Sequence, residues 1–192
     1  MKYVLAFGVT LWGAASAWPL LPWLQLAPPP AGTQFYQIQA KSVDTHPRAT
    51  TAVNNQRVTL PSSLSSYALA TAQTSATKFF VQKYNATNTW AFHNADDTRQ
   101  LALQGPNGTL LYLVDATNPS SDDILTGQLM EWATFTVDNN VLGVNDGSTP
   151  KNRTFAAVKG AGTSYTLALY DGVSSTTQTI SPVTLNLARS GS

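Results

Sequence analysis

Hydrophobic and polar residues alternate along most of the chain after Thr33. The alternation is clearest in the runs 36–41, 79–82, 132–137, 165–169 and 183–187. Because successive side chains of a strand point to opposite faces, this period of two predicts strands with one buried face. The run 110–114 is apolar at every position, which predicts a central strand covered on both faces.

Short turn-forming segments separate these runs. Gly105–Gly108 and Asp138–Asn140 each join two apolar runs, and similar residues stand at 145–147, 159–162 and 171–172. Glycine, asparagine and aspartate tolerate the positive φ that tight turns need. About eleven short strands separated by such turns predict an all-β fold, an antiparallel β-sandwich or a flattened β-barrel. The Ala- and Ser-rich segment 62–76 lacks a helical apolar stripe and is expected to be loop, irregular strand or a short helical turn.

A β-trefoil is the alternative architecture. Strands containing phenylalanine recur near Phe35, Phe79 and Phe135, at spacings of 44 and 56 residues. Three pseudo-repeats of roughly this size would be expected of a trefoil. The uneven spacing, and the lack of alignment at other positions, favour the sandwich or barrel.

The N-terminus predicts secretion. Lys2 precedes the apolar stretch 3–11, and Ala15–Ala17 matches the small-x-small cleavage pattern of a signal peptide. The alternative is an uncleaved anchor over 3–27, a length that suffices to span a bilayer but is interrupted by glycine and proline. We therefore expect a signal peptide at 1–17, a Pro-rich leader at 18–33, one all-β domain at 34–189 and a tail at 190–192. The leader is expected to be flexible; packing of Trp18 and Trp23 on the domain is the alternative.

The amino-acid composition limits the kinds of partner and chemistry that we expect of the protein. Charged residues make up 11% of the chain and the net charge is +1, so no electrostatic field attracts nucleic acid. The chain has no cysteine, which excludes disulfides and thiolate chemistry. Three sequons, at Asn85, Asn107 and Asn152, are predicted sites of N-glycosylation and agree with secretion.

Several strand and turn segments carry a resemblance to a known group of proteins. They are Phe35–Ile38, Phe79–Val81, Phe135–Asp138 leading to Leu142, Phe155–Ala157, Tyr165 with Tyr170–Gly172, and Val183–Leu187. Through them the chain resembles small secreted cell-wall proteins of filamentous fungi, the group of the phialide-development protein and related IgE-binding antigens. The resemblance implies an all-β fold and a cell-wall or other extracellular location, with no assigned activity. Members usually carry cysteines in the C-terminal half, and no functional residue is carried over.

The residues capable of catalysis predict no active site. His46 and His93 lack spaced carboxylate partners and are expected to be exposed, so neither a metal site nor another cofactor is predicted. No Gly-x-Ser-x-Gly segment is present to support a hydrolytic triad. The acidic residues are interpreted as solvated loop acids: Asp96, Asp97, Asp115, Asp122, Asp123, Glu131 and Asp138. The alternatives are a glycosidase pair among them and a Ca²⁺ site at Asp115, Asp122 and Asp123.

Aromatic residues provide the best binding hypothesis. Alternation places Trp132, Thr134 and Thr136 on the polar face of one strand, where the indole is able to stack on a sugar ring. Phe80 and Tyr84 share the polar face of another strand. The alternative is that a second sheet or the leader covers these rings.

The sequence therefore predicts a secreted, non-catalytic extracellular or cell-wall protein. The first alternative is a carbohydrate-binding, lectin-like module, and the second is a secreted hydrolase. The expected partner is cell-wall polysaccharide, with neither nucleic acid nor a stable membrane insertion after signal cleavage.

Overall fold

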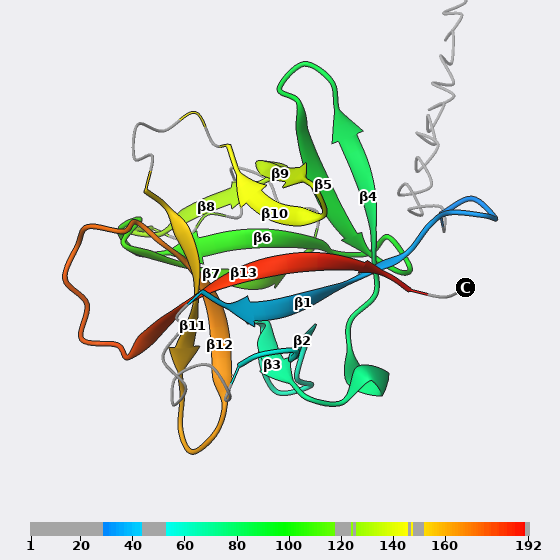
Figure 1. The fold of residues 1–192 in the computed structure, drawn as a ribbon. Helices are drawn as coiled ribbons and strands as arrows, with labels where there is room; N and C mark the ends of the chain where they lie inside the picture. The colour runs from blue at the N-terminus through cyan, green and yellow to red at the C-terminus, as the bar shows by residue number, and fades with distance from the viewer. Residues whose placement is uncertain are drawn as a thin grey trace, which may run out of the picture.

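The fold is almost entirely β-structure. The computed structural model describes residues 29–43, 53–117, 124, 126–145, 147 and 152–190 (Figure 1). The predicted signal peptide, the leader up to residue 28, His46, Asp122 and Asp123 lie outside the described residues. The strands are β1 (Tyr36–Ser42), β2 (Arg57–Thr59), β3 (Ala68–Ala70), β4 (Phe79–Tyr84), β5 (Thr89–Asn94), β6 (Gln100–Gly105), β7 (Leu110–Ala116), β8 (Leu129–Trp132), β9 (Phe135–Asp138), β10 (Val141–Val144), β11 (Thr154–Lys159), β12 (Tyr165–Tyr170) and β13 (Ile180–Arg189). The segment 62–76 holds β3 and one 3₁₀ turn, Gln73–Ser75, as expected.

Six of the strands close a barrel. β1 pairs with β4, β4 with β5, β5 with β9, β9 with β10, β10 with β13, and β13 with β1, all antiparallel. The last pairing joins the two ends of the domain and removes the edges that an open sheet would expose. The predicted antiparallel all-β class is thus confirmed, with the sheet folded into a flattened barrel.

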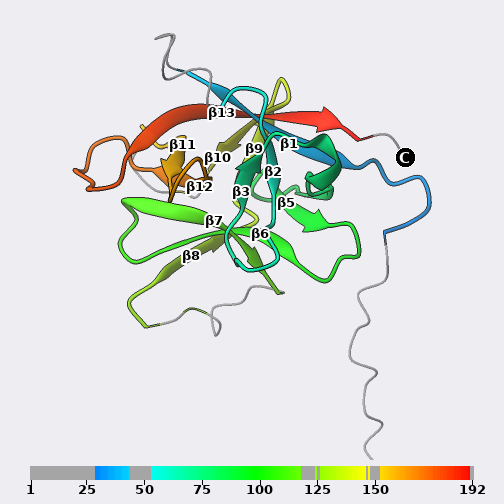
Figure 2. The ribbon, with the colours of Figure 1, turned by 90° about the horizontal axis from the view of Figure 1, so that it is seen from below.

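Three hairpins cap this barrel. β2 pairs with β3, β6 with β7 and β11 with β12, and the hairpins are joined by the pairings β3–β12 and β12–β7. Tyr67, Leu113 and Leu167, all completely buried, meet where the hairpins converge: the amide of Tyr67 donates to the carbonyl of Leu113, and that of Leu167 to the carbonyl of Tyr67. β8 adds an extra strand to β6. Seen from below, β2 and β3 lie over the middle of the molecule (Figure 2).

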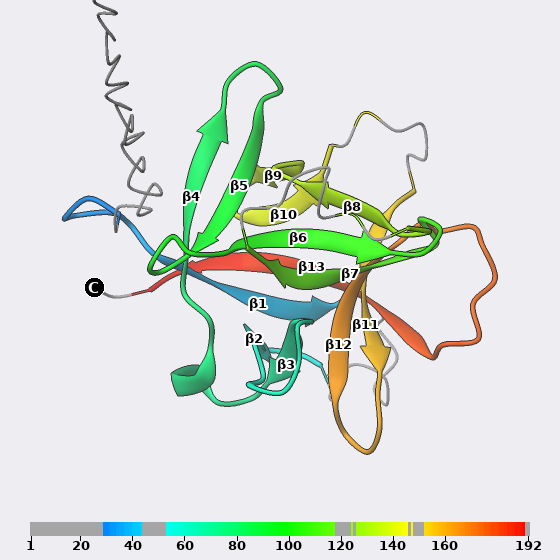
Figure 3. The ribbon, with the colours of Figure 1, turned by 180° about the vertical axis from the view of Figure 1, so that it is seen from behind.

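The connectivity has an internal three-fold pattern. Each unit consists of a barrel strand, a capping hairpin and a second barrel strand, and the units begin at Tyr36, Thr89 and Val141, about 52 residues apart. This is the strand arrangement of the β-trefoil alternative. The β4–β5 hairpin, which joins the first unit to the second, projects to the opposite side from the β11–β12 hairpin (Figures 1 and 3).

Every barrel strand contributes an apolar side chain to the core. In chain order these are Ile38, Phe79, Phe92, Phe135, Leu142 and Leu185, none more than 3% exposed. The three phenylalanine rings pack edge to face, with centroids 6.4 Å apart for Phe79–Phe92 and 5.6 Å apart for Phe92–Phe135. Edge-to-face contacts suit the ring quadrupoles and add to the free energy of burial.

The predicted turn chemistry is confirmed at several hairpins. Asn139 and Asn140, between β9 and β10, have φ of 49° and 64°, and Gly108, between β6 and β7, has φ of 75°. Asparagine adopts this left-handed region more readily than most residues, because its short polar side chain bonds locally. Leu110, Leu111, Leu113 and Val114 are all buried, as the continuous apolar run of β7 predicts.

Truncation of Leu185 tests the dependence of the fold on barrel closure. Leu185 faces Ala40 on β1 and Leu142 on β10, so Leu185→Ala leaves a cavity beside both. We expect the free energy of unfolding to fall by about 3 kcal/mol, measured by urea denaturation. Val173→Ala, at a residue 73% exposed, is the control and should change stability by less than about 0.5 kcal/mol. Equal losses in the two variants would contradict the assigned closure.

Candidate functional site

A break between β8 and β9 shapes the first candidate site. β8 ends at Trp132, β9 begins at Phe135, and Ala133 between them has φ of 55°. Trp132, Thr134 and Thr136 therefore do not share the face of one continuous strand, contrary to the expectation from alternation. Trp132 and Thr134 line the same pocket, whereas Thr136 lies opposite Gly143 on the β9–β10 ladder.

The pocket containing Trp132 lies between the tip of the β4–β5 hairpin and the break before β9. Its volume is about 490 Å³, and we call it the Trp132 pocket; its lining residues are Tyr84, Thr87, Thr89, Trp132, Ala133, Thr134, Asn145 and Gly147. Two contacts hold its walls: the amide of Asn145 donates to the carbonyl of Thr134 at 2.8 Å, and the hydroxyls of Thr87 and Thr89 lie 2.6 Å apart. The volume lies in the range of small-molecule pockets.

The lining of the Trp132 pocket combines aromatic rings with hydroxyl and amide groups. Tyr84 is 42% exposed, and Trp132 is partly exposed. None of the lining residues that the structure describes is charged. The hydroxyl of Thr134 is buried and has no hydrogen-bond partner among the described residues. Such a surface suits a neutral ligand that has an apolar face and polar edges.

Phe80, the other ring of the polar β4 face, does not line the Trp132 pocket. It stacks on His93 with centroids 4.9 Å apart and meets Phe35 edge to face. His93 is itself 6% exposed, and its Nδ1 lies 2.7 Å from Oδ1 of Asp97. The expectation of an exposed His93 is therefore wrong, because Phe80 and Asp97 cover the imidazole.

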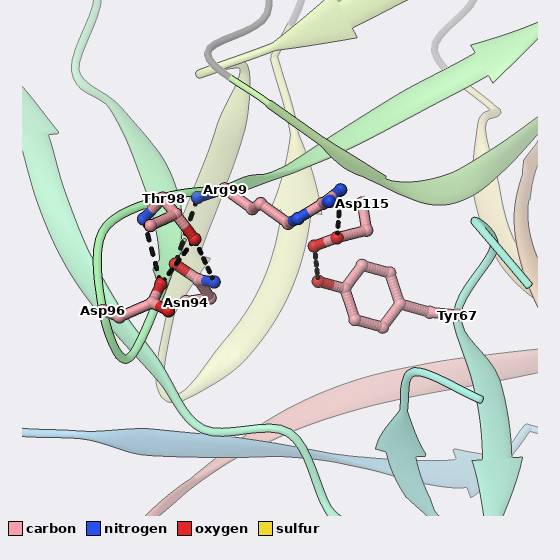
Figure 4. Close-up of polar contacts among 6 residues, drawn as sticks. All are labelled: Tyr67, Asn94, Asp96, Thr98, Arg99 and Asp115. Carbon is pink, nitrogen blue, oxygen red and sulfur yellow. Dashed lines mark hydrogen bonds and ion pairs between the residues drawn. The ribbon is translucent and has the colours of Figure 1, made fainter. Parts of the chain in front are cut away.

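A second cleft, at the other end of β5, is built around Asp115. Its volume is about 580 Å³, and we call it the Arg99 cleft; its lining residues are Leu60–Ser65, Tyr67, Thr77, Asn94, Asp96, Thr98, Arg99 and Asp115. The hydroxyl of Tyr67 donates to Oδ1 of Asp115 at 2.8 Å, and Nη1 of Arg99 lies 3.0 Å from Oδ2 (Figure 4). The side chain of Asp115 is 4% exposed, so the two partners balance an almost buried charge.

The turn between β5 and β6 provides the polar wall of the Arg99 cleft. Oδ1 of Asp96 accepts hydrogen bonds from the amide and hydroxyl of Thr98, and Asn94 bonds both the hydroxyl of Thr98 and the amide of Arg99 (Figure 4). The hydrogen bonds from Thr98 lower the pKa of Asp96 below its usual value, since they favour the ionised carboxylate.

Four of the acidic residues in the glycosidase alternative have other partners or lie exposed, while Asp122 and Asp123 lie outside the described residues. A general acid requires a raised pKa, but that of Asp96 is lowered, and Asp115 is already paired with Arg99. Glu131 forms a bidentate contact with Arg153 at 3.0 and 3.1 Å, and Asp138 lies exposed at the end of β9. No group of three or more histidine or acidic residues suited to a metal ion occurs within the described ranges.

The three predicted glycosylation sites lie on the surface. Asn85 is in the β4–β5 turn, Asn107 in the β6–β7 turn and Asn152 two residues before β11, and all three are exposed. Oδ1 of Asn107 accepts a hydrogen bond from the amide of Thr109. Asn85 lies one residue from Tyr84 and two from Thr87, both of which line the Trp132 pocket.

Comparison of the chain with protein-family models, with curated proteins and with solved structures finds no match. Within the part of the chain that the structure describes, no helix has both the length and the apolar character needed to cross a membrane. The molecule is therefore described by its own geometry, a β-barrel with a three-hairpin cap and a surface pocket at each end of β5.

Substitution of Tyr67 tests the buried network through its pH dependence. Burial, and then the neighbouring Asp115, raise the pKa of Tyr67 well above its ordinary value of 10.0. Above pH 10 the unfolded chain therefore loses a proton that the folded protein retains, and stability falls by up to about 1.4 kcal/mol per pH unit. In Tyr67→Phe we expect lower stability at pH 7, by about 1.5–3 kcal/mol, but a shallower decline from pH 10 to 11.

Urea denaturation at pH 7, 9, 10 and 11 provides the measurement. Tyr84→Phe, which alters an exposed tyrosine, is the matched control and should follow the wild-type pH dependence. A Tyr67→Phe profile parallel to that of the wild type above pH 10 would contradict the assigned network.

Proposed function

We propose that this protein is a non-catalytic extracellular protein that binds neutral carbohydrate, such as a cell-wall polysaccharide, through the Trp132 pocket. The observation that carries the proposal is the joint presence of Trp132, Tyr84 and three threonines around a pocket whose described lining residues carry no charge. The carbon face of a sugar ring packs on aromatic rings, while its hydroxyls exchange hydrogen bonds with threonine and asparagine side chains.

The extracellular part of the proposal rests on the sequence. The N-terminal 17 residues have the pattern of a cleaved signal. The three sequon asparagines lie in exposed segments outside the strands, where a glycan disturbs no backbone pairing. The resemblance to fungal cell-wall proteins agrees with both.

The non-catalytic part of the proposal rests on the surroundings of two acidic side chains, Asp96 and Asp115. Hydrogen bonds from Thr98 lower the pKa of Asp96, and Asp115 is bound by Arg99, arrangements that do not favour either residue as a proton donor. The hydrolase alternative requires turnover of a wall polysaccharide or ester that disappears in Asp96→Asn or Asp115→Asn.

Removal of the indole tests the binding proposal. Trp132→Ala should weaken binding to the preferred oligosaccharide at least about tenfold, a loss of about 1.4 kcal/mol, because the stacking surface is removed. A glycan array identifies that sugar, and isothermal titration calorimetry measures the affinity. Thr134→Val should also weaken binding, since it removes a hydroxyl from the pocket wall.

Thr136→Val is the matched control for that experiment. Thr136 lies two residues after Thr134, in β9 and outside the pocket lining, so the loss of its hydroxyl should leave the affinity unchanged. Unchanged binding in a folded Trp132→Ala variant, or equal losses in the two threonine variants, would place carbohydrate binding elsewhere and overturn the assignment.

A glycan on Asn85 should interfere with this site. Because Asn85 stands between two lining residues of the pocket, Tyr84 and Thr87, an attached glycan competes with ligand for the same space. For protein made in a glycosylating host, we expect Asn85→Gln to bind the oligosaccharide more tightly than the wild type. Asn107→Gln, which removes a glycan from the remote β6–β7 turn, should not change the affinity, and an equal gain in both variants would contradict the steric explanation.

A further inference from the structure

The Arg99 cleft is separate from the Trp132 pocket. Thr89, at the start of β5, lines the Trp132 pocket, whereas Asn94, at the end of β5, lines the cleft. Five residues of extended strand separate the two sites by about 17 Å. A small ligand bound in one therefore leaves the other open.

The two walls of the cleft differ in chemistry. Leu60, Pro61 and Leu64 contribute apolar surface from the loop before β3, and Leu64 is 50% exposed although it is a large apolar residue. Asn94 and Thr98 contribute amide and hydroxyl groups from the opposite turn. A sugar ring is amphipathic in the same way, with a carbon face and hydroxyl edges, so it satisfies both walls at once.

The polar side chains at the floor of the Arg99 cleft are held in place by their neighbours, and Arg99 still has hydrogen-bond donors that face solvent. Arg99 is held through Nη1 on Asp115 while its side chain stays 49% exposed, so the guanidinium retains donors for a ligand. Oδ1 of Asp96 accepts both hydrogen bonds from Thr98, and the Asp96 side chain lines the cleft. Ser62, Ser63 and Ser65 are exposed and add hydroxyls on the loop side of the cleft.

The charge balance of the cleft selects against anions. The charge of Arg99 is neutralised by Asp115 at 3.0 Å, which leaves Asp96 as the uncompensated charge among the lining residues. A phosphate or carboxylate ligand would meet a negative site, whereas a neutral ligand with hydroxyl groups would not.

We propose that the Arg99 cleft is a second binding site for a neutral saccharide, so that one molecule carries two sites. The proposal rests on the proposed carbohydrate binding and extends it: a molecule with two separate sites links two polysaccharide chains, or two segments of one chain. The saccharide packs its carbon face on Pro61 and Leu64 and bonds its hydroxyls to Arg99 and Asp96.

A blocking substitution tests this site without disturbing the buried network. Ser63 is exposed and lines the cleft, so Ser63→Phe fills the entrance while Tyr67, Arg99 and Asp115 keep their contacts. Ser175→Phe, at an exposed serine on the distant β12–β13 connection, is the matched control. Thermal unfolding confirms that each variant is folded.

Calorimetric titration with neutral trisaccharides of glucose, N-acetylglucosamine and mannose gives the number of sites. We expect two sites in the wild type and in Ser175→Phe, one in Ser63→Phe, one in Trp132→Ala and none in the double variant. One site in the wild type, lost in Trp132→Ala and retained in Ser63→Phe, would overturn the second site and leave the proposed function standing. No binding of any trisaccharide would overturn both. Tighter binding of an acidic trisaccharide at the cleft would contradict the assigned ligand class.

Discussion

Closure of the sheet by β1 and β13 is the constraint on which the rest of the structure depends. The two strands pair over seven residues, from Tyr36 with Arg189 to Ser42 with Val183. With no cysteine in the chain, this closure comes from backbone pairing and burial alone. Ile38 on β1 and Leu185 on β13 are both fully buried, so the same strands that close the ring also fill it. β13 is also the common neighbour of β10 and β11.

The barrel strands form the frame of the molecule, and most residues of the two candidate sites lie in the connections between strands. The Trp132 pocket forms where the chain leaves β8, turns through Ala133 and enters the barrel as β9. The Arg99 cleft forms where the β5–β6 turn faces the loop before β3. Strand residues mostly face the core or a neighbouring strand, so polar side chains with unused hydrogen-bonding capacity concentrate in the connections.

Local alternation predicted the strands well but not their long-range arrangement. The runs 36–41, 165–169 and 183–187 correspond to β1, β12 and β13. In a strand the alternating apolar side chains all point to one face, and that face is buried in the core. The three-fold pattern was harder to detect, since Phe79 and Phe135 occupy equivalent barrel strands while the third equivalent strand, β13, carries Leu185 instead. Phe35 precedes β1, so the spacing from Phe35 to Phe79 does not measure the length of a repeat.

The candidate sites were only partly predictable. Trp132 and Thr134 were identified from alternation, but the break at Ala133 was not, because alanine has no preference for positive φ. Glycine or asparagine there would have marked a turn. Tyr67 and Asp115 are 48 residues apart, and no local pattern signals that a tyrosine outside an alternating run will meet an aspartate at the end of a buried strand.

In the Tyr67–Asp115–Arg99 network an almost buried carboxylate holds both a buried tyrosine and a half-exposed arginine. Burial of a carboxylate costs free energy that its partners at best offset, and an ion pair with a half-exposed arginine contributes little to stability. An apolar side chain at position 115 would avoid that cost but would leave the buried hydroxyl of Tyr67 without its acceptor. What the carboxylate does provide is orientation, since it fixes one edge of the Arg99 guanidinium at the floor of an open cleft. A guanidinium held in this way loses little conformational entropy when a ligand binds, which is the advantage of a preformed site.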